Sequence, residues 1–370
     1  MKAILSFSAI FLALTALVAW YIGQRMGTSF PTIPRRVWVI SIGGIMACIV
    51  LCMMFYAASP TAHPFGRTAY QFSGIAIALV MMLLFATIAV DLVNLIARFS
   101  PHTRGVLSLS LTGILLLYSL INSFTPRVKE LTIPIEGLTK EITVVQLTDI
   151  HLGNFRSERE VRKLVKKVNA LNPDVVMNTG DLFDARYPLE KGSVLDGFKA
   201  LKAPQYFVFG NHDQHVGVSE VVAQAKAAGM VVLENEVAQF GELQIIGLNN
   251  MAVDAEHFDV HASPADGTIK DALNQMNIDK SKPTVVLHHR PAGEKYMYEH
   301  GADLLLAGHT HAGQVFPATF IAQQMFPFYS GLYDYQGMKV YVSEGSGTFF
   351  TPIRLGARSE ITLIRLVPKE

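Results

Sequence analysis

Four long apolar runs occupy the first third of the chain. They cover Ile4–Ile22, Val37–Ala58, Ala69–Val90 and Gly105–Phe124, and none contains a charged residue. Each has about 20 residues, the length that crosses a hydrocarbon core as a helix. The first run is longer than the apolar core of a cleaved signal peptide, and three further runs follow it. The pattern predicts a four-helix transmembrane region over residues 1–126.

After this region, short β-rich runs alternate with helical patterns. Strands are expected at Leu131–Ile135, Ile142–Leu147, Asp174–Asn178, Gln205–Phe209, Leu243–Leu248, Thr284–His288, Asp303–Ala307, Lys339–Val342 and Ile361–Leu366. Helices are expected at Ser157–Asn172, where Ser157 and Glu160 form a capping-box pattern, and at Ser219–Ala228. This alternation predicts an α/β sandwich, with helices covering a largely parallel or mixed sheet, as a second domain over residues 127–370.

Charge separates the two parts further. Residues 1–126 contain seven basic residues and one acidic residue, Asp91, which leaves 24 of the 31 basic and 29 of the 30 acidic residues after them. The loops after the first and third apolar runs carry five arginines, against two basic residues at the N-terminus and after the second run. Because basic loops stay in the cytoplasm, we expect the first and third loops there and the N-terminus outside. After four spans, the second domain would then also lie outside the cytoplasm.

Composition argues against several classes of function. A transporter or channel usually buries several ionisable groups in its spans, and the only candidate here is Asp91, so an anchor is favoured. The second domain is net acidic and shows no basic footprint, so nucleic acid is not an expected partner. Cys48 and Cys52 both lie in an apolar run, which leaves the polar part without a disulfide, a thiolate metal ligand or a cysteine nucleophile.

Five polar motifs each follow directly after an expected strand. They are Asp149-Ile150-His151, Gly180-Asp181, Gly210-Asn211-His212-Asp213, His288-His289 and Gly308-His309-Thr310-His311. The carboxyl ends of strands in an α/β sheet meet at one edge, so we expect the five motifs to converge. The glycines before Asp181, Asn211 and His309 would allow a tight turn at each strand end.

The donors of this set are oxygen and nitrogen, which suit Mn, Fe or Zn. An aspartate between two such ions can bridge them, and a pair of ions clamps the attacking and leaving oxygens of a phosphoryl displacement. Each motif alone is weak evidence, since a lone His-x-His is more often part of a surface strand. The ordered set predicts a dinuclear centre for phosphoester hydrolysis.

The order D-x-H, GD, GNHD, H and GHTH resembles the calcineurin-like metallophosphoesterases, over roughly Leu131 to Leu366. The sequence looks closest to the bacterial membrane-linked subgroup, whose members read GHTHGGQ and end in R-x-G-x-x-x-E-I. Here the first of these reads GHTHAGQ, with Ala312 in place of a usual glycine, and the second runs from Arg354 to Ile361. The multi-span front end is similar to that of transmembrane members of the family.

The resemblance implies a role for each motif residue. Asp149, His151 and His311 would hold the first metal, Asn211, His289 and His309 the second, and Asp181 would bridge them. His212 would stabilise the transition state or protonate the leaving oxygen, with Asp213 orienting it. His289 is favoured over His288 because it lies two residues before Pro291. A metal-bridging hydroxide would attack phosphorus, without a covalent enzyme intermediate.

The substrate is less well defined. The anchor favours a lipid-linked phosphate ester such as a phospholipid, and the sequence leaves a diester or a monoester open. Segment Val315–Tyr335 is rich in aromatic residues, which lie either at a membrane interface or in the core under a long loop. An alternative is a membrane sensor or assembly factor that binds a phospholigand without turnover. The complete set of seven ligands and His212 argues against it.

Overall fold

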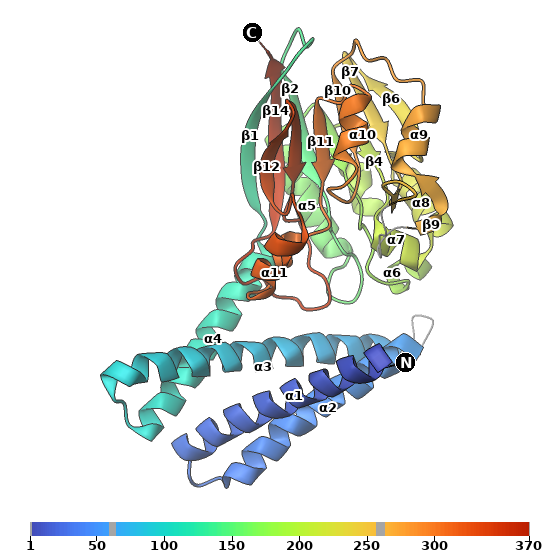
Figure 1. Cartoon of the computed structure of the whole chain (residues 1–370). Helices are drawn as coiled ribbons and strands as arrows, with labels where there is room; N and C mark the ends of the chain where they lie inside the picture. The colour runs from blue at the N-terminus through green and yellow to red at the C-terminus, as the bar shows by residue number, and fades with distance from the viewer. Residues whose placement is uncertain (1, 59–63, 257–262, 370) are drawn as a thin grey trace. The chain divides into compact units, whose positions relative to one another are not determined.

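The apolar runs form helices in the computed structural model, which describes residues 2–58, 64–256 and 263–369. The helices are α1 (Lys2–Ser29), α2 (Arg35–Ala58), α3 (Pro64–Ala97) and α4 (Pro101–Phe124). The chain divides into two units, residues 1–121 with 350–353, and residues 122–349 with 354–370. We describe each unit by itself (Figure 1).

Three helices of the described chain are long and apolar enough to cross a membrane. They are Arg35–Ala57, Phe65–Ala97 and Pro101–Phe124. The expected first span, Ile4–Ile22, falls within α1, but the side chains of residues 2–12 lie outside the described residues. The structure therefore supports three membrane-spanning helices rather than the four expected.

Asp91 is paired within the helical unit. Its carboxylate lies 2.6 Å from Arg25 Nε and accepts a hydrogen bond from the Tyr21 hydroxyl at 2.7 Å. Arg104 Nη1 lies 3.8 Å away. Because pairing lowers the cost of holding a charge near hydrocarbon, these contacts give Asp91 a role in helix packing, as expected of an anchor.

The second unit contains two six-stranded mixed sheets. The first has the order β1-β14-β2-β3-β4-β5, with β1 (Arg127–Ile135), β2 (Ile142–Leu147), β3 (Val175–Asn178), β4 (Gln205–Phe207), β5 (Met230–Val232) and β14 (Glu360–Pro368). The second has the order β12-β13-β11-β10-β7-β6, with β6 (Glu236–Phe240), β7 (Leu243–Gly247), β10 (Thr284–Leu287), β11 (Leu304–Ala307), β12 (Gly331–Tyr335) and β13 (Met338–Val342). A short pair, β8 (Met251–Ala252) and β9 (Ser263–Thr268), lies apart from both.

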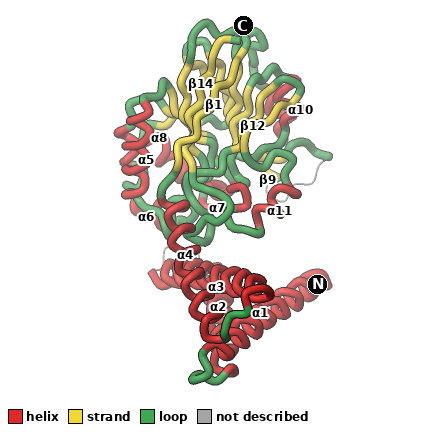
Figure 2. Tube along the Cα trace, turned by 90° about the vertical axis from the view of Figure 1, so that its left-hand side faces the viewer, coloured by secondary structure: helices red, strands yellow, loops and turns green. Residues whose placement is uncertain are grey.

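Three apolar layers hold the sheets and helices together. Val144, Val285 and Tyr341 belong to the layer between the two sheets, which is wholly buried. A second layer packs α5 (Glu158–Leu171) and α8 (Val218–Ala227) on the outer face of the first sheet. A third packs α9 (Ile269–Gln275) and α10 (Glu294–Glu299) on the second sheet. Figure 2 shows α5 and α8 on one side of the strands and α10 on the other. The expected α/β sandwich is confirmed.

Shorter helices complete the unit. They are α6 (Tyr187–Lys191), α7 (Asn211–Val216), α11 (Ala318–Met325) and the 3-10 turns Asp196–Ala200 and His311–Gly313. Helix α5 begins after Ser157, whose backbone N–H donates to the Glu160 carboxylate at 3.0 Å, as its capping-box pattern predicts.

Candidate metal centre

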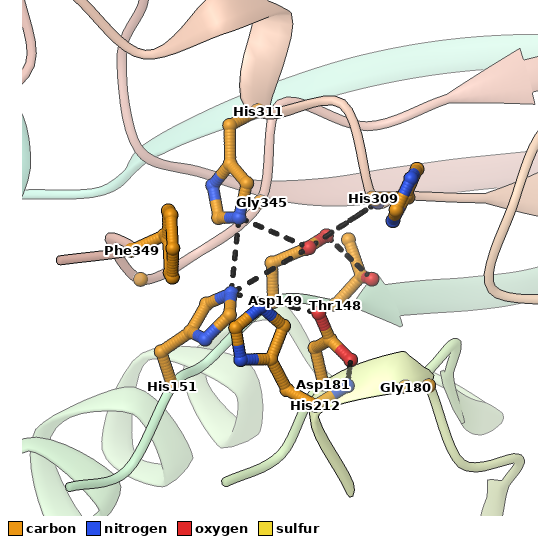
Figure 3. Close-up of polar contacts among 12 residues, drawn as sticks. Thr148, Asp149, His151, Gly180, Asp181, His212, His309, His311, Gly345 and Phe349 are labelled. Atoms are coloured by element: carbon orange, nitrogen blue, oxygen red, sulfur yellow. Dashed lines mark hydrogen bonds and ion pairs between the residues drawn. The ribbon is translucent and has the colours of Figure 1, made fainter. Parts of the chain in front are cut away.

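The five polar motifs converge at the carboxyl ends of the parallel strands. Asp149 and His151 follow β2, Asp181 follows β3, and Asn211 begins the helix after β4. From the second sheet, His289 follows β10, and the His309–His311 segment follows β11. Figure 3 shows the side chains of Asp149, His151, Asp181 and His311 turned toward one another.

One group of donors surrounds Asp149. His311 Nε2 lies 3.3 Å from Asp149 Oδ1, and His151 Nε2 lies 3.8 Å from the same oxygen. The two Nε2 atoms are 3.0 Å apart. Asp149 is fixed by the Thr148 hydroxyl, which donates to Oδ2 at 2.8 Å, and by the backbone N–H of His309. The three side chains place one ligand atom each within 4.8 Å of one another, close enough to share an ion.

Asp181 lies between this group and a second one. Its Oδ2 is 3.7 Å from His151 Nε2 and 3.1 Å from His289 Nε2, while its Oδ1 accepts the backbone N–H of His212 at 2.9 Å. On the far side, His309 Nδ1 lies 2.9 Å from Asn211 Oδ1. One oxygen of Asp181 is thus directed at histidines from both groups, as a bridging ligand requires.

The hydrogen bonds of His289 test whether it suits a metal. Its Nδ1–H donates to the Thr179 carbonyl at 2.8 Å, which leaves Nε2 as the nitrogen facing Asp181. This buried Nε2 forms no hydrogen bond within the described residues, although Asp181 Oδ2 is 3.1 Å away. A backbone carbonyl on Nδ1 is the usual partner of a metal-bound histidine, so His289 fits a ligand. His288 instead points its Nδ1–H at the Arg290 carbonyl and joins neither donor group.

The charge of the centre favours a cation. Burial alone would raise the pKa of Asp149, but His311 and His151 hold it well below its usual range. The pKa of Asp181 is also lowered, since His289 outweighs the effect of burial. Burial would lower the pKa of His289, but Asp181 raises it to about 9. These shifts favour positive charge beside the two carboxylates, and a metal ion bound there would displace protons from its histidine ligands.

Several candidate ligands have strained backbones. Asp149, His151, Asp181, His309 and His311 all have positive φ values, between 50° and 70°. Such conformations cost free energy in residues other than glycine and cluster at functional sites. Ala312 shares the conformation, with φ at 50°, where a glycine would be under less strain.

The glycines of the motifs serve mainly to make room. Among those expected at tight turns, Gly180 has a positive φ of 97°, whereas Gly210 is extended at −99°. A Cβ atom at Gly210 would lie 2.1 Å from Asp181 Oδ1, and one at Gly308 would lie 2.2 Å from Asp149 Oδ2. Both positions need glycine because a carboxylate passes against the backbone.

His212 lies at the edge of the donor cluster. Its side chain is 24% exposed, and its ring meets those of His151 and Phe349 edge-on at 4.8 and 5.0 Å. Asp184 Oδ1 lies 3.3 Å from His212 Nδ1 and 3.5 Å from His151 Nδ1. Asp184, which the sequence analysis did not single out, therefore serves both rings. The only hint of this role in the sequence is that Asp184 lies three residues after Asp181.

Asp213, which the resemblance suggested as the residue that orients His212, is bound to backbone groups. Its buried carboxylate accepts hydrogen bonds from the backbone N–H groups of Gly210, Leu182 and Phe183. These bonds join the loop after β3 to the start of α7. The side chain that neighbours His212 is Asp184 rather than Asp213, so we assign Asp213 a structural part.

Two residues of the C-terminal motif, Arg354 and Glu360, hold the loop that packs against the centre. Arg354 is fully buried, lies 3.0 Å from His311 Nδ1 through Nη2, and donates to the carbonyl oxygens of Glu344 and Gly347. Glu360 accepts hydrogen bonds from the Tyr341 hydroxyl and the Glu344 backbone N–H. The loop that they hold packs on Asp149, since the N–H of Gly347 donates to the Asp149 carbonyl.

Apolar side chains flank the centre. The ring of Phe326 meets His309 edge-on at 5.7 Å. Helix α11, just before it, exposes Phe320, Ile321 and Met325. Phe328 packs instead against Tyr333 and the outer core. The aromatic segment Val315–Tyr335 is thus not uniform, because one part is exposed and another part lies in the core.

Comparisons with known proteins agree with this geometry. Residues 142–313 match a family model described as calcineurin-like phosphoesterase. An uncharacterized metallophosphoesterase of Campylobacter jejuni is 34% identical over 305 residues, which cover 78% of this chain and 79% of the relative. A Danio rerio transmembrane protein with metallophosphoesterase domain is 30% identical, covering 91% and 82%. A Helicobacter pylori metallophosphoesterase is 33% identical, covering 66% of this chain and 65% of its own length.

Proposed function

The chain belongs to the calcineurin-like metallophosphoesterase family, and from this premise we propose that it is a membrane-anchored phosphoesterase that uses two metal ions. The convergence of buried oxygen and nitrogen donors from five strand ends is the observation that carries the proposal. Asp149, His151 and His311 would hold one ion.

Asn211, His289 and His309 would hold the second ion, with Asp181 shared between the two. The distances from Asp181 Oδ2 to His151 and His289 support the sharing. Mn, Fe or Zn suits this mixture of donors. When bound, such a pair supplies an activated water and stabilises charge on the attacking and leaving oxygens. Asp181 itself is kept in place by the backbone N–H of His212.

His212 would donate the proton that the leaving oxygen needs. Its side chain is partly exposed, at 24%, and Asp184 is close enough to fix the orientation of its ring. A proton donor held at hydrogen-bond distance from its orienting carboxylate is a common arrangement in acid catalysis. In this assignment the leaving group lies beside Phe349, whose ring adjoins His212.

We propose a lipid-linked phosphate ester as the substrate, either a diester or a monoester. Helix α11 presents Phe320 and Met325, which are 60% and 63% exposed. The helix ends at Met325, one residue before Phe326, whose ring contacts His309. Exposed apolar patches of this kind mark surfaces that meet a membrane or a partner. An apolar substrate tail would find such a surface next to the phosphate site.

The anchor would comprise residues 1–126, with spans in α2, α3 and α4, and the hydrolase domain residues 127–370. We expect that domain outside the cytoplasm, since the loop arginines favour this orientation. Three helices of sufficient length and a transmembrane relative support attachment to a membrane.

Hydrolysis by the full-length protein tests the proposal. Protein purified in detergent, stripped with a chelator and reloaded with Mn²⁺, Fe²⁺ or Zn²⁺, would be assayed on bis-p-nitrophenyl phosphate and p-nitrophenyl phosphate. We expect turnover to return with metal. Retention of a phosphate ligand without turnover under every metal would favour the alternative of a non-hydrolytic membrane sensor.

A further inference from the structure

A second cavity, apart from the metal centre, lies between α5 and the residues that follow α4. It has a volume of about 450 Å³, within the range of about 300–1,000 Å³ that is typical of small-molecule sites. Its apolar lining comes from Phe124, Pro126, Ile150, Leu164 and Ala170. We call this cavity the α5 groove.

Basic side chains border the α5 groove. Lys163, Lys166 and Lys167 line it, and Glu160 is the single acidic residue among its lining. Lys167 donates to the Pro126 carbonyl, and Lys163 lies 3.8 Å from Glu160. Lys166 has no ion pair within the described residues. The groove therefore combines apolar walls with a surplus of positive charge.

A buried arginine strengthens that surplus. Arg156 lines the groove and is only 5% exposed. Its Nη2 donates to the Ser123 carbonyl at 2.7 Å, and its guanidinium stacks 4.9 Å from the centre of the Phe124 ring. Its Nε is buried and has no hydrogen-bond partner in the described parts of the chain. An unused donor on a buried cation is unfavourable unless an anion approaches it.

These features together fit an amphiphile with an anionic head. Phe124, in the groove wall, is also the last residue of the candidate span Pro101–Phe124, so a bilayer lipid is the nearest source of one. We propose that the α5 groove binds an anionic phospholipid, its acyl chain against the apolar walls and its phosphate near Lys166 and Arg156. The lipid would be bound rather than hydrolysed, because none of the residues that line the groove is a candidate metal ligand.

Photo-crosslinking of the full-length protein tests this site without relying on turnover. The protein would be placed in phosphatidylcholine nanodiscs that contain phosphatidylglycerol with a diazirine in one acyl chain. Labelled peptides would be mapped by mass spectrometry, with the membrane spans as the internal reference. We expect labelling within Glu158–Leu171, whereas the same probe on phosphatidylcholine should label this helix several-fold less.

Charge and shape variants separate the two halves of the proposal. A Lys163→Glu/Lys166→Glu pair should lower α5 labelling about 30-fold, since two basic residues near an anionic surface contribute about 1 kcal/mol each. Arg159→Glu/Arg162→Glu is the matched control, because both residues lie on α5 and do not line the groove. Ala170→Trp should also reduce labelling by filling the groove without a change of charge.

Three results would overturn the proposal. The first is an α5 helix that stays unlabelled while the spans are labelled. The second is an equal loss in the charge variant and its control, and the third is equal labelling by the phosphatidylcholine probe. Unchanged labelling of the spans and an unchanged melting temperature would show that each variant is folded.

Discussion

Replacing His212 with alanine should remove one chemical step and leave the metal centre intact. The ring lies at the rim, where it contacts Asp184, the edge of His151 and the exposed ring of Phe349. The backbone N–H that holds Asp181 Oδ1 belongs to any residue at this position, so alanine keeps it. We therefore expect Asp181, and both metal ions, to remain in place.

The size of the effect follows from the proton that His212 would deliver. General acid catalysis contributes about 10²–10⁴-fold, which is about 2.7–5.5 kcal/mol at 1.36 kcal/mol for each factor of ten. His212→Ala should lower kcat by this factor for alkyl phosphate esters. The loss should shrink to about tenfold for p-nitrophenyl esters, because that leaving oxygen needs little protonation.

The assay is a series of phosphate esters whose leaving groups differ in acidity. The variant should show a steeper dependence of kcat on leaving-group pKa than the unchanged protein, with two metals retained by elemental analysis. Equal losses across the series would refute proton donation and favour a purely electrostatic role. Loss of an ion would make His212 a ligand, a role that its grouping with His151 and Asp181 would permit.

Two aspartates provide matched comparisons for this variant. Asp184→Asn should reproduce part of the leaving-group effect, since its carboxylate lies 3.3 Å from the His212 ring. Asp213→Asn should lower the melting temperature and leave the slope unchanged, because its carboxylate serves three backbone N–H groups. The opposite pattern would return the orienting role to Asp213.

Other predictions test the membrane setting and the strained backbone. Phe320→Ser with Ile321→Ser should slow hydrolysis of a phospholipid in vesicles but not of a soluble ester, and equal rates on vesicles would contradict membrane presentation. Phosphatase fused after Glu370 should be active and green fluorescent protein dark, and the reverse would overturn the orientation. Ala312→Gly should raise the melting temperature, since a left-handed alanine costs roughly 1–2 kcal/mol; a fall would show that no strain is relieved.

The sequence predicted the elements whose pattern is strong. All nine expected strands occur, because each is a β-rich run bounded by polar residues, and all but β1 are mostly buried. Five strands were not foreseen, namely β5, β6, β8, β9 and β12. The side chains of β6 and β12 alternate between exposed and half-buried positions near polar turns, which weakens their pattern. Helix α1 was read as a span, and the structure supports spans only for the three helices after it.

The motif residues were predictable because each motif places its polar side chains within a few consecutive positions of the sequence. The supporting residues were not, because their contacts join distant parts of the chain. Arg354 reaches a histidine 43 positions earlier, and nothing in the spacing of the C-terminal motif indicates that contact. The aromatic segment was divided by tertiary packing. Phe328 is a core residue, so changing it to serine would test folding rather than membrane contact, and Phe320 is the better choice.

The central claim is that Asp181 joins two metal sites in a hydrolytic centre. Metal content and turnover should be measured on the same preparations of the full-length protein and of Asp181→Ala, after reloading with Mn²⁺. We predict two ions per chain and measurable hydrolysis of bis-p-nitrophenyl phosphate in the unchanged protein. The variant should lose bound metal and orders of magnitude in kcat together. Near-normal turnover in Asp181→Ala, or a single ion in a fully active unchanged protein, would contradict the dinuclear account.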